Sequence, residues 1–201
     1  MARTPDLEMK RELLDSVVAY LAKNGLGDMS LRPMAAALGT SPNRLVHHFG
    51  SKSELLEAAL AHNTATQQDI QNAWLAAQPS MSYANLLRNW WTWMIAAPEN
   101  LALVRLGLEA ATLEATHTGL RGDVRAEQIG IWRTSMEQRL TIEGLSPKDA
   151  ALESSLLKGL YTGLMIDLMA TGETERLSIA VEAGLQRHER VVAEANARSF
   201  V

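Results

Sequence analysis

Apolar residues recur at three- and four-residue spacing along most of the chain, and no stretch alternates apolar and polar residues as a half-buried strand would. At the start this spacing is carried by Leu7, Leu13, Leu14, Val17, Val18 and Leu21. The pattern predicts nine helices, at about 7–23, 31–38, 42–48, 52–77, 82–97, 99–115, 121–143, 147–170 and 174–196. The predicted fold class is therefore all-α.

Capping residues mark several of these helix boundaries. Ser30 is placed to cap the second helix, and Ser41 followed by Pro42 is a strong start signal for the third. The run 51–54, Ser-Lys-Ser-Glu, forms a capping box at the start of the fourth helix. The Ser-Pro pair at 146–147 repeats the start signal at the eighth.

The amino-acid composition excludes several classes of function. The chain has 201 residues, of which 47% are hydrophobic, enough for a substantial core. It contains no cysteine, which excludes disulfides, cysteine-ligated zinc fingers and thiol catalysis. The first residues resemble no signal peptide, and no uncharged run approaches the roughly 18 residues needed to span a bilayer. We therefore expect a soluble, cytoplasmic protein with no membrane partner.

The net charge of −4 is unevenly distributed. Residues 1–55 hold seven Lys or Arg against six Asp or Glu, so this segment carries about +1 and the rest about −5. The asymmetry has the direction expected of a nucleic-acid-binding head, but it is too small to predict one by itself.

Two short helices joined by a tight turn, with a third helix beside them, are typical of a helix-turn-helix unit. The turn is Gly39-Thr40-Ser41, and Leu38, Leu45 and Phe49 are placed to form the small core. The second short helix can enter a major groove with its N-terminal residues at the base edges.

Three residues occupy that N-terminal end: Pro42, Asn43 and Arg44. Asparagine pairs with adenine and arginine with guanine, each worth about 1–3 kcal/mol of discrimination. Lys52 begins the next helix, where an ammonium group and the positive helix end both favour a phosphate.

The run 30–56 resembles the DNA-binding head of the tetracycline-repressor (TetR) family. The resemblance covers roughly residues 10–60, because the turn, the His-His-Phe ending and the Ser-Lys-x-x-Leu opening of the fourth helix all fall in register. The nine-helix plan and the close of the eighth helix at 167–172 match as well. It implies a DNA-binding domain at 1–50 and a helical ligand-binding and dimerisation domain at 51–201.

The resemblance also implies which residues contact DNA. Arg32 matches a position that often touches a base, and His47 and His48 match positions near bases or backbone. The expected DNA-binding set is Arg32, Ser41, Pro42, Asn43, Arg44, His47, His48 and Lys52. One position departs from the family: Val46 stands where a tyrosine usually donates to a phosphate, so one backbone contact is expected to be missing.

Specific binding by so short a helix needs two heads on a pseudo-palindrome, so we expect a homodimer. The resemblance implies that the eighth and ninth helices form the interface, and their apolar and small residues support it. The expected interface set is Leu156, Gly159, Leu160, Gly163, Leu164, Ile179 and Ala183. The alternative is that this stripe packs within one subunit.

Large polarizable side chains gather where the family places an effector pocket. The expected pocket set is Trp90, Trp91, Met94, Arg105, His117, Trp132, Met136, Tyr161 and Met165. Such a mainly apolar lining with few polar groups suits a small hydrophobic or aromatic effector. The alternative is that these aromatic residues simply fill the core.

The sequence therefore predicts a DNA-binding transcriptional regulator, a repressor released from its operator when a small effector shifts the population of conformations. No phosphate-binding loop, nucleophile elbow, zinc-protease motif or paired catalytic carboxylates are found, so we expect neither an enzyme nor a metal or cofactor. The alternative is a small-molecule binding or protein-interaction module of the same fold with weak or lost DNA recognition. The sequence does not decide between repression and activation.

Overall fold

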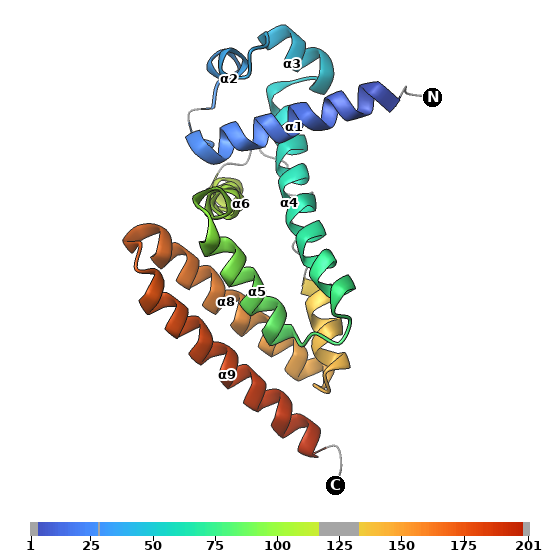
Figure 1. The fold of residues 1–201 in the computed structure, drawn as a ribbon, viewed down its shortest axis with the longest axis vertical. Coiled ribbons are helices and arrows are strands. Elements are labelled where there is room, and N and C mark those ends of the chain that lie inside the picture. The colour runs from blue at the N-terminus through green and yellow to red at the C-terminus, as the bar shows by residue number, and fades with distance from the viewer. Residues whose placement is uncertain (1–3, 28, 117–132, 199–201) are drawn as a thin grey trace. The chain divides into compact units, whose positions relative to one another are not determined.

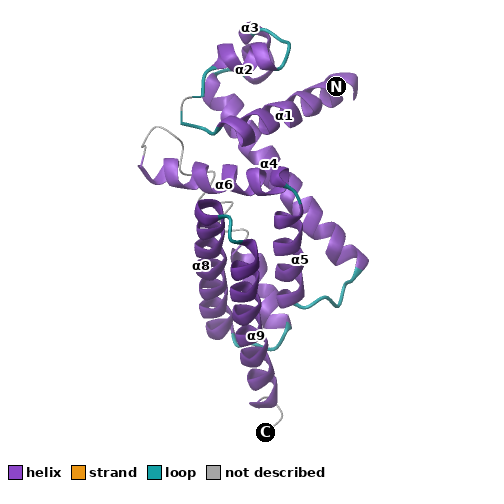
Figure 2. Cartoon of the chain, turned by 60° about the vertical axis from the view of Figure 1, so that its left-hand side comes forward, coloured by secondary structure: helices purple, strands orange, loops and turns teal. Residues whose placement is uncertain are grey.

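The computed structural model describes residues 4–27, 29–116 and 133–198, and within these ranges every regular element is a helix (Figures 1 and 2). The bounds are α1 Thr4–Asn24, α2 Leu31–Ala37, α3 Pro42–Phe49, α4 Lys52–Ala77, α5 Tyr83–Ala96, α6 Pro98–Thr116, α8 Pro147–Thr171 and α9 Thr174–Arg198. Residues 133–142 are also helical and belong to the helix predicted at 121–143, whose earlier part lies outside the described residues. The predicted all-α class is confirmed.

Helix boundaries agree with prediction to within one residue except at the two ends of the chain, where α1 begins three residues earlier and α9 ends two residues later. The extra residues are Thr4, Pro5 and Asp6 at one end and Ala197 and Arg198 at the other. None is a large apolar residue, so they leave no mark on the hydrophobic pattern.

The predicted caps are present at three of the four serines. The Ser41 hydroxyl accepts from the Arg44 amide at 3.2 Å, and the Ser146 hydroxyl accepts from the Asp149 amide at 3.1 Å. The capping box also forms: the amide of Glu54 donates to the Ser51 hydroxyl, and the amide of Ser51 donates to the Glu54 carboxylate. The prediction for Ser30 was wrong in detail, because this residue occupies the N-cap position of α2 but its side chain accepts no capping hydrogen bond.

The chain divides into two compact units, one of residues 1–73 with 96–122 and one of residues 74–95 with 123–201. The first therefore contains α1 to α3, most of α4, and α6. The functional boundary predicted between residues 50 and 51 lies inside this unit and stays a prediction, since a division by packing need not coincide with one by function.

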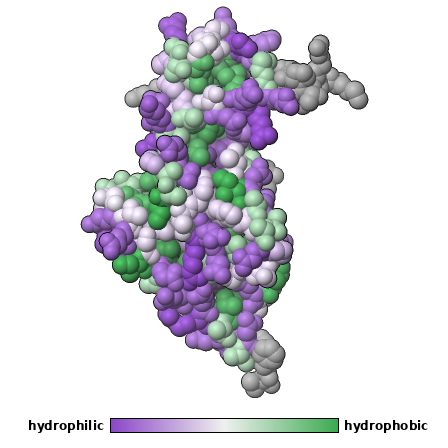
Figure 3. All heavy atoms as spheres, in the orientation of Figure 1, coloured by the Kyte–Doolittle hydropathy of each residue, from purple (hydrophilic) through white to green (hydrophobic). Residues whose placement is uncertain are grey.

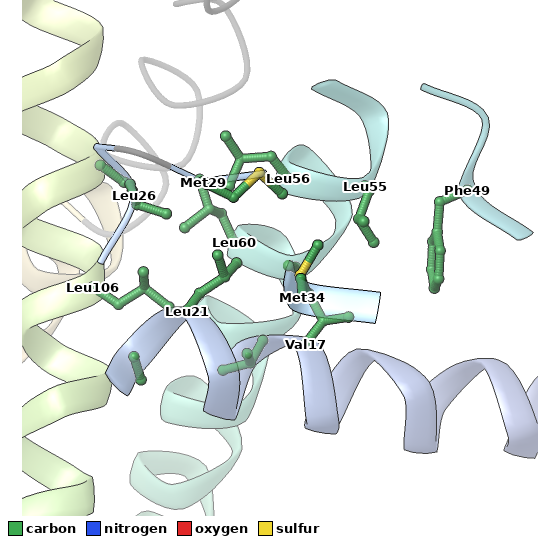
Figure 4. Close-up of a cluster of buried hydrophobic side chains, with 14 of the residues drawn as sticks. Val17, Leu21, Leu26, Met29, Met34, Phe49, Leu55, Leu56, Leu60 and Leu106 are labelled. Carbon is green, nitrogen blue, oxygen red and sulfur yellow. The ribbon is translucent and has the colours of Figure 1, made fainter. Parts of the chain in front are cut away.

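The core of the first unit is formed by side chains that converge from α1, α2, α3, α4 and α6 (Figure 4). Val17, Leu21, Met34 and Leu45 are fully shielded from solvent. Leu38 and Phe49 join them as the sequence predicted, Leu38 half-buried and Phe49 buried. Burial of this kind contributes about 1.5–3 kcal/mol for each large apolar side chain.

Polar contacts tie α6 to α1 and α4 within the same unit. The Glu109 carboxylate accepts from the Leu26 amide at 2.7 Å, just beyond the end of α1. The Asn63 side-chain amide, which is buried in α4, donates to the Leu103 carbonyl at 3.0 Å. The first bond gives a partner to the Leu26 amide just beyond the end of α1, and the second joins α4 to α6.

In the second unit α5, α8 and α9 pack around Trp91, Tyr161 and Leu185. The Trp91 indole donates to the Ser178 hydroxyl at 2.9 Å and meets the Tyr161 ring edge-on. The buried Glu153 carboxylate of α8 is paired with two α9 side chains: Arg187 donates at 2.5 and 2.9 Å, and His188 lies at 3.0 Å. A buried carboxylate therefore has the partners it requires.

Arg88 of α5 joins α9 through two carboxylates. Its guanidinium lies 2.8 Å from Glu182 and 2.7 Å from Glu189. The hydrogen bonds from Arg88 hold the pKa of both carboxyls below the ordinary value for glutamate. Both carboxylates are more than 40% exposed, so solvent screens much of the attraction.

Arg88→Met is expected to lower the free energy of unfolding at pH 7 by about 1 kcal/mol, the sum of two partly screened ion pairs. Because the folded-state pKa of both carboxyls is depressed, their contribution is present above the ordinary glutamate pKa and is lost as the pH falls through the folded value. The difference from wild type should therefore shrink below about pH 4.3. Urea unfolding followed by circular dichroism between pH 7 and 3.5 measures it.

Arg190→Met is the control, because it removes an exposed guanidinium from α9, the helix that carries Glu182 and Glu189. Its difference from wild type is expected to stay near zero at both ends of the pH range. An Arg88 variant whose destabilisation is the same at pH 7 and pH 3.5 contradicts the assignment.

Candidate DNA interface, effector residues and dimer face

One face of α3 is anchored and the other is exposed. Leu45 is wholly buried and Phe49 is 8% exposed, so the two hold the helix against the core of the first unit. Asn43, Arg44 and His47 lie on the exposed face. The predicted readout residues of α3 thus lie where a major groove is able to reach them.

The other predicted DNA residues are exposed or half-buried as well. Arg32 near the start of α2, Ser41 before α3 and Lys52 at the start of α4 are exposed, while Pro42 and His48 are half-buried. All belong to the first unit. The structure therefore brings the predicted set into one unit, and whether these residues contact DNA stays a prediction.

Val46 is 42% exposed and belongs to the exposed face of α3. A valine side chain has no polar atom to donate to a phosphate, and the missing phosphate contact stays a prediction.

The imidazoles of His47 and His48 meet edge-on, with ring centroids 5.5 Å apart. Among the described residues no group of three or more His, Asp or Glu side chains is arranged to hold a metal ion.

Helix α1 lies against α3, which sequence reasoning missed. A guanidinium nitrogen of Arg44 donates to the Met9 sulfur at 3.6 Å, and the Lys10 ammonium lies 5.2 Å from the centre of the Phe49 ring. The hydrophobic pattern of α1 gave no signal for this, because both α1 residues lie outside its apolar stripe.

The predicted effector residues of the second unit are mostly interior. Trp91, Met94 and Met136 are at most 4% exposed, and Tyr161 and Met165 at most 8%. The buried hydroxyl of Tyr161 has no hydrogen-bond partner within the described part of the chain. Burial raises the pKa of this phenol, so the hydroxyl keeps its proton and remains a donor.

Trp90 belongs to a half-exposed aromatic cluster. It stacks on Trp93 with ring centroids 4.8 Å apart and meets Trp74 edge-on at 6.5 Å. The sequence did not single out Trp74, because it lies at the far end of another helix.

Three other predicted pocket residues do not belong to the described residues of the second unit. His117 and Trp132 lie outside the described residues. Arg105 belongs to the first unit, where it donates to the Ala22 carbonyl at the end of α1. This guanidinium thus already has a structural partner.

The predicted dimer residues of α8 form part of an exposed stripe. Gly159 and Gly163 are exposed, and so are the large apolar residues Leu152, Leu156 and Ile166, at 59%, 46% and 56%. Positions 152, 156, 159, 163 and 166 repeat at three- and four-residue spacing, which places them on one face of the helix. Leu152 and Ile166 were missed from the sequence, because periodicity alone does not show which apolar stripe of a helix is covered.

The remaining predicted dimer residues differ in exposure. Ile179 of α9 is 67% exposed and Ala183 is exposed, whereas Leu160 and Leu164 are half-buried. A Cβ added at Gly184 would lie 2.2 Å from the Leu160 side chain, so Leu160 is occupied with packing α8 against α9. Figure 3 shows one face of the molecule, on which apolar residues form separate patches among polar ones.

No described helix is long and apolar enough to cross a membrane.

A family model matches part of the N-terminal region. Residues 13–59 match the family model described as bacterial regulatory proteins, tetR family. This range contains α2, α3 and the start of α4. The search of curated proteins found no match.

Solved structures share the fold of the chain. One is described as a TetR-family transcriptional regulator from Rhodococcus sp., with a TM-score of 0.72 and 18% identity over 89% of this chain and 97% of that one. A transcriptional regulator from Saccharomonospora viridis in complex with choline has a TM-score of 0.69 and 19% identity over 89% and 96%. A TetR-family regulator from Mesorhizobium loti MAFF303099 has a TM-score of 0.60 and 22% identity over 94% and 98%.

Proposed function

We propose that this chain, whose N-terminal domain belongs to the tetR family of bacterial regulatory proteins and whose fold is that of TetR-family regulators, is a repressor of transcription. In this proposal a homodimer binds a pseudo-palindromic operator and is released by a small, mainly hydrophobic effector. The protein would act in the bacterial cytoplasm, on the nucleoid.

One observation carries the DNA-binding part of the proposal. Asn43 and Arg44 are exposed at the N-terminal end of a helix that Leu45 anchors in the core. A rigidly held helix that presents an amide and a guanidinium has the chemistry that reads adenine and guanine in the major groove. Lys52, exposed at the start of α4, supplies a charge for the phosphate backbone.

The exposed stripe of α8 supports the homodimer. An eight-residue recognition helix reads few base pairs, so two heads are needed for a specific site. Leu152, Leu156 and Ile166 expose apolar surface along one face of a 25-residue helix, with glycines between them that permit close approach. A second copy of the same stripe is the self-complementary partner that two-fold symmetry requires.

The effector part of the proposal is supported by Tyr161. Its buried hydroxyl has no hydrogen-bond partner among the described residues, and a buried donor without an acceptor costs about 1–3 kcal/mol. An effector with one acceptor on an apolar body would relieve that cost. Indole faces such as those of Trp90 and Trp93 also suit a quaternary ammonium group, and one protein of the same fold holds choline.

Release from DNA then follows from a difference in affinity. An effector shifts the population toward a conformation that does not bind the operator only as far as it binds that conformation more tightly. No catalytic step is part of this proposal.

The second candidate is a binding module of the same fold without sequence-specific DNA recognition. Val46 favours it, because the exposed valine removes one phosphate donor. This alternative predicts DNA retention that is independent of sequence and of Arg44.

Selection of randomised duplex DNA on the purified protein is expected to enrich an inverted repeat. Arg44→Ala should weaken binding to the selected duplex about 5- to 150-fold, because it removes a base contact worth about 1–3 kcal/mol. Fluorescence anisotropy at two salt concentrations measures both affinities.

The matched control is Arg133→Ala, which removes the same charge from the second unit, where Arg133 pairs with Glu137. It should bind the selected duplex like wild type. Retention that depends only on salt, and is equal for all three proteins, would instead support the second candidate.

Leu156→Glu is expected to convert the dimer to a monomer, because it places a charge in the centre of the exposed α8 stripe. Sedimentation equilibrium should give half the mass of wild type, with helical content unchanged by circular dichroism. Operator affinity should fall together with dimerisation.

Ile142→Glu provides the comparison, since Ile142 is 85% exposed in the segment 133–142 and lies outside α8 and α9. It should remain dimeric. A dimeric Leu156 variant would exclude the α8 stripe as the interface.

A further inference from the structure

The guanidinium of Arg44 has a partner on α1 in the absence of DNA. One of its terminal nitrogens donates to the Met9 sulfur at 3.6 Å, and both residues are exposed. A thioether is a weak acceptor, so this contact holds the side chain loosely. Arg44 must leave the sulfur before it can pair with a base, and any change that strengthens the contact competes with DNA.

Met9 is also the most solvent-exposed of the described methionines. It is 38% exposed, whereas Met169 is half-buried. The others are at most 8% exposed: Met29, Met34, Met81, Met94, Met136 and Met165. The chain contains no cysteine, so no thiol competes for an oxidant. Oxidation of methionine follows exposure, so among the described methionines Met9 is the thioether that an oxidant in solution reaches first.

We propose that Met9 is an oxidation site that controls whether Arg44 is free to contact DNA, an inference that rests on the proposed DNA-binding function. The oxidant is a peroxide. The sulfur attacks one oxygen of hydrogen peroxide, the O–O bond breaks and an S–O bond forms. Sulfur loses two electrons, peroxide is reduced, and water leaves, so that thioether and hydrogen peroxide give sulfoxide and water.

The sulfoxide changes the strength of the contact with Arg44. Its oxygen is a strong acceptor, and a hydrogen bond from a guanidinium to such an oxygen is charge-assisted. The product therefore holds Arg44 on α1 more firmly than the thioether does, and sequence-specific binding is weakened. Methionine sulfoxide is reduced by dedicated reductases, so the change is reversible.

Lys10 makes the position of Met9 well defined. Its ammonium lies over the Phe49 ring, and Phe49 is anchored in the core of the first unit. The α1 residues beside α3 are thus held at the recognition helix by a second contact. An added oxygen on Met9 stays within reach of Arg44.

The test uses the whole 201-residue chain and the duplex that selection yields. Wild type treated with hydrogen peroxide, with peptide mass spectrometry placing one added oxygen on Met9, is expected to bind that duplex at least about fivefold more weakly, the loss that corresponds to part of one arginine–base contact. Methionine sulfoxide reductase should restore the affinity. The nonspecific affinity for an unrelated duplex should change little.

Two variants separate this effect from general damage. Met9→Leu keeps an apolar side chain that peroxide does not oxidise, so its affinity should be unchanged by the same treatment. Met9→Gln places an amide oxygen near the position of the sulfoxide oxygen and should bind weakly without peroxide. Equal losses in wild type and Met9→Leu, or no loss after Met9 is fully oxidised, would overturn the proposal.

A readout without DNA keeps the two proposals distinguishable. If unoxidised wild type selects no duplex, the proposed DNA-binding function fails. The rate of proton exchange at the Arg44 guanidinium, measured by NMR, then still tests the contact between Met9 and Arg44. Peroxide treatment should slow this exchange in wild type and leave it unchanged in Met9→Leu. Unchanged exchange after oxidation of Met9 contradicts the inference in either case.

Discussion

Burial of Leu45 is the constraint on which the rest of the first unit depends. An eight-residue helix is too short to be stable alone in water, so α3 exists because tertiary packing holds it. Leu45 and Phe49 enter a core that also contains Val17 and Met34. With one face of α3 committed to that core, the residues between them, Val46 and His47 among them, have to face outward. The exposed chemistry of the recognition helix follows from its buried half.

The same core includes side chains of α6, a helix from much later in the chain. Leu106 of α6 packs among the buried side chains of the first unit, while Glu109 and Asn63 supply the polar contacts at its edges. Because these two hydrogen bonds join α6 to the end of α1 and to α4, α6 is part of what holds α1 and α4 in place. The unit that presents the recognition helix therefore includes residues far from it in sequence.

Weak contacts surround the exposed face of α3. The sulfur contact of Arg44 and the ring contact of Lys10 are individually weak, and each is made by an exposed side chain. Weak contacts are suited to a side chain that has to change partner, since they hold it in place at little cost to its release. By contrast, the Glu153 carboxylate is buried and fully paired, as a group with a purely structural role requires.

Local features of the chain were readable from the sequence by itself. The all-α class, the turn at Gly39 with its φ of +64° and the serine caps of α3, α4 and α8 depend on interactions within a few residues, and short-range patterns encode these well. The outward face of α3 was likewise predictable, because Leu45 and Phe49 are four residues apart and so share one face of the helix. Only the tertiary structure decided that α6 packs with the head, that Arg105 is bonded to the end of α1, that Leu152 and Ile166 extend the exposed stripe of α8, and that Met9 meets Arg44. Each of these depends on which helix surfaces are covered by distant parts of the chain, and helical periodicity shows that a face is apolar without showing what packs against it.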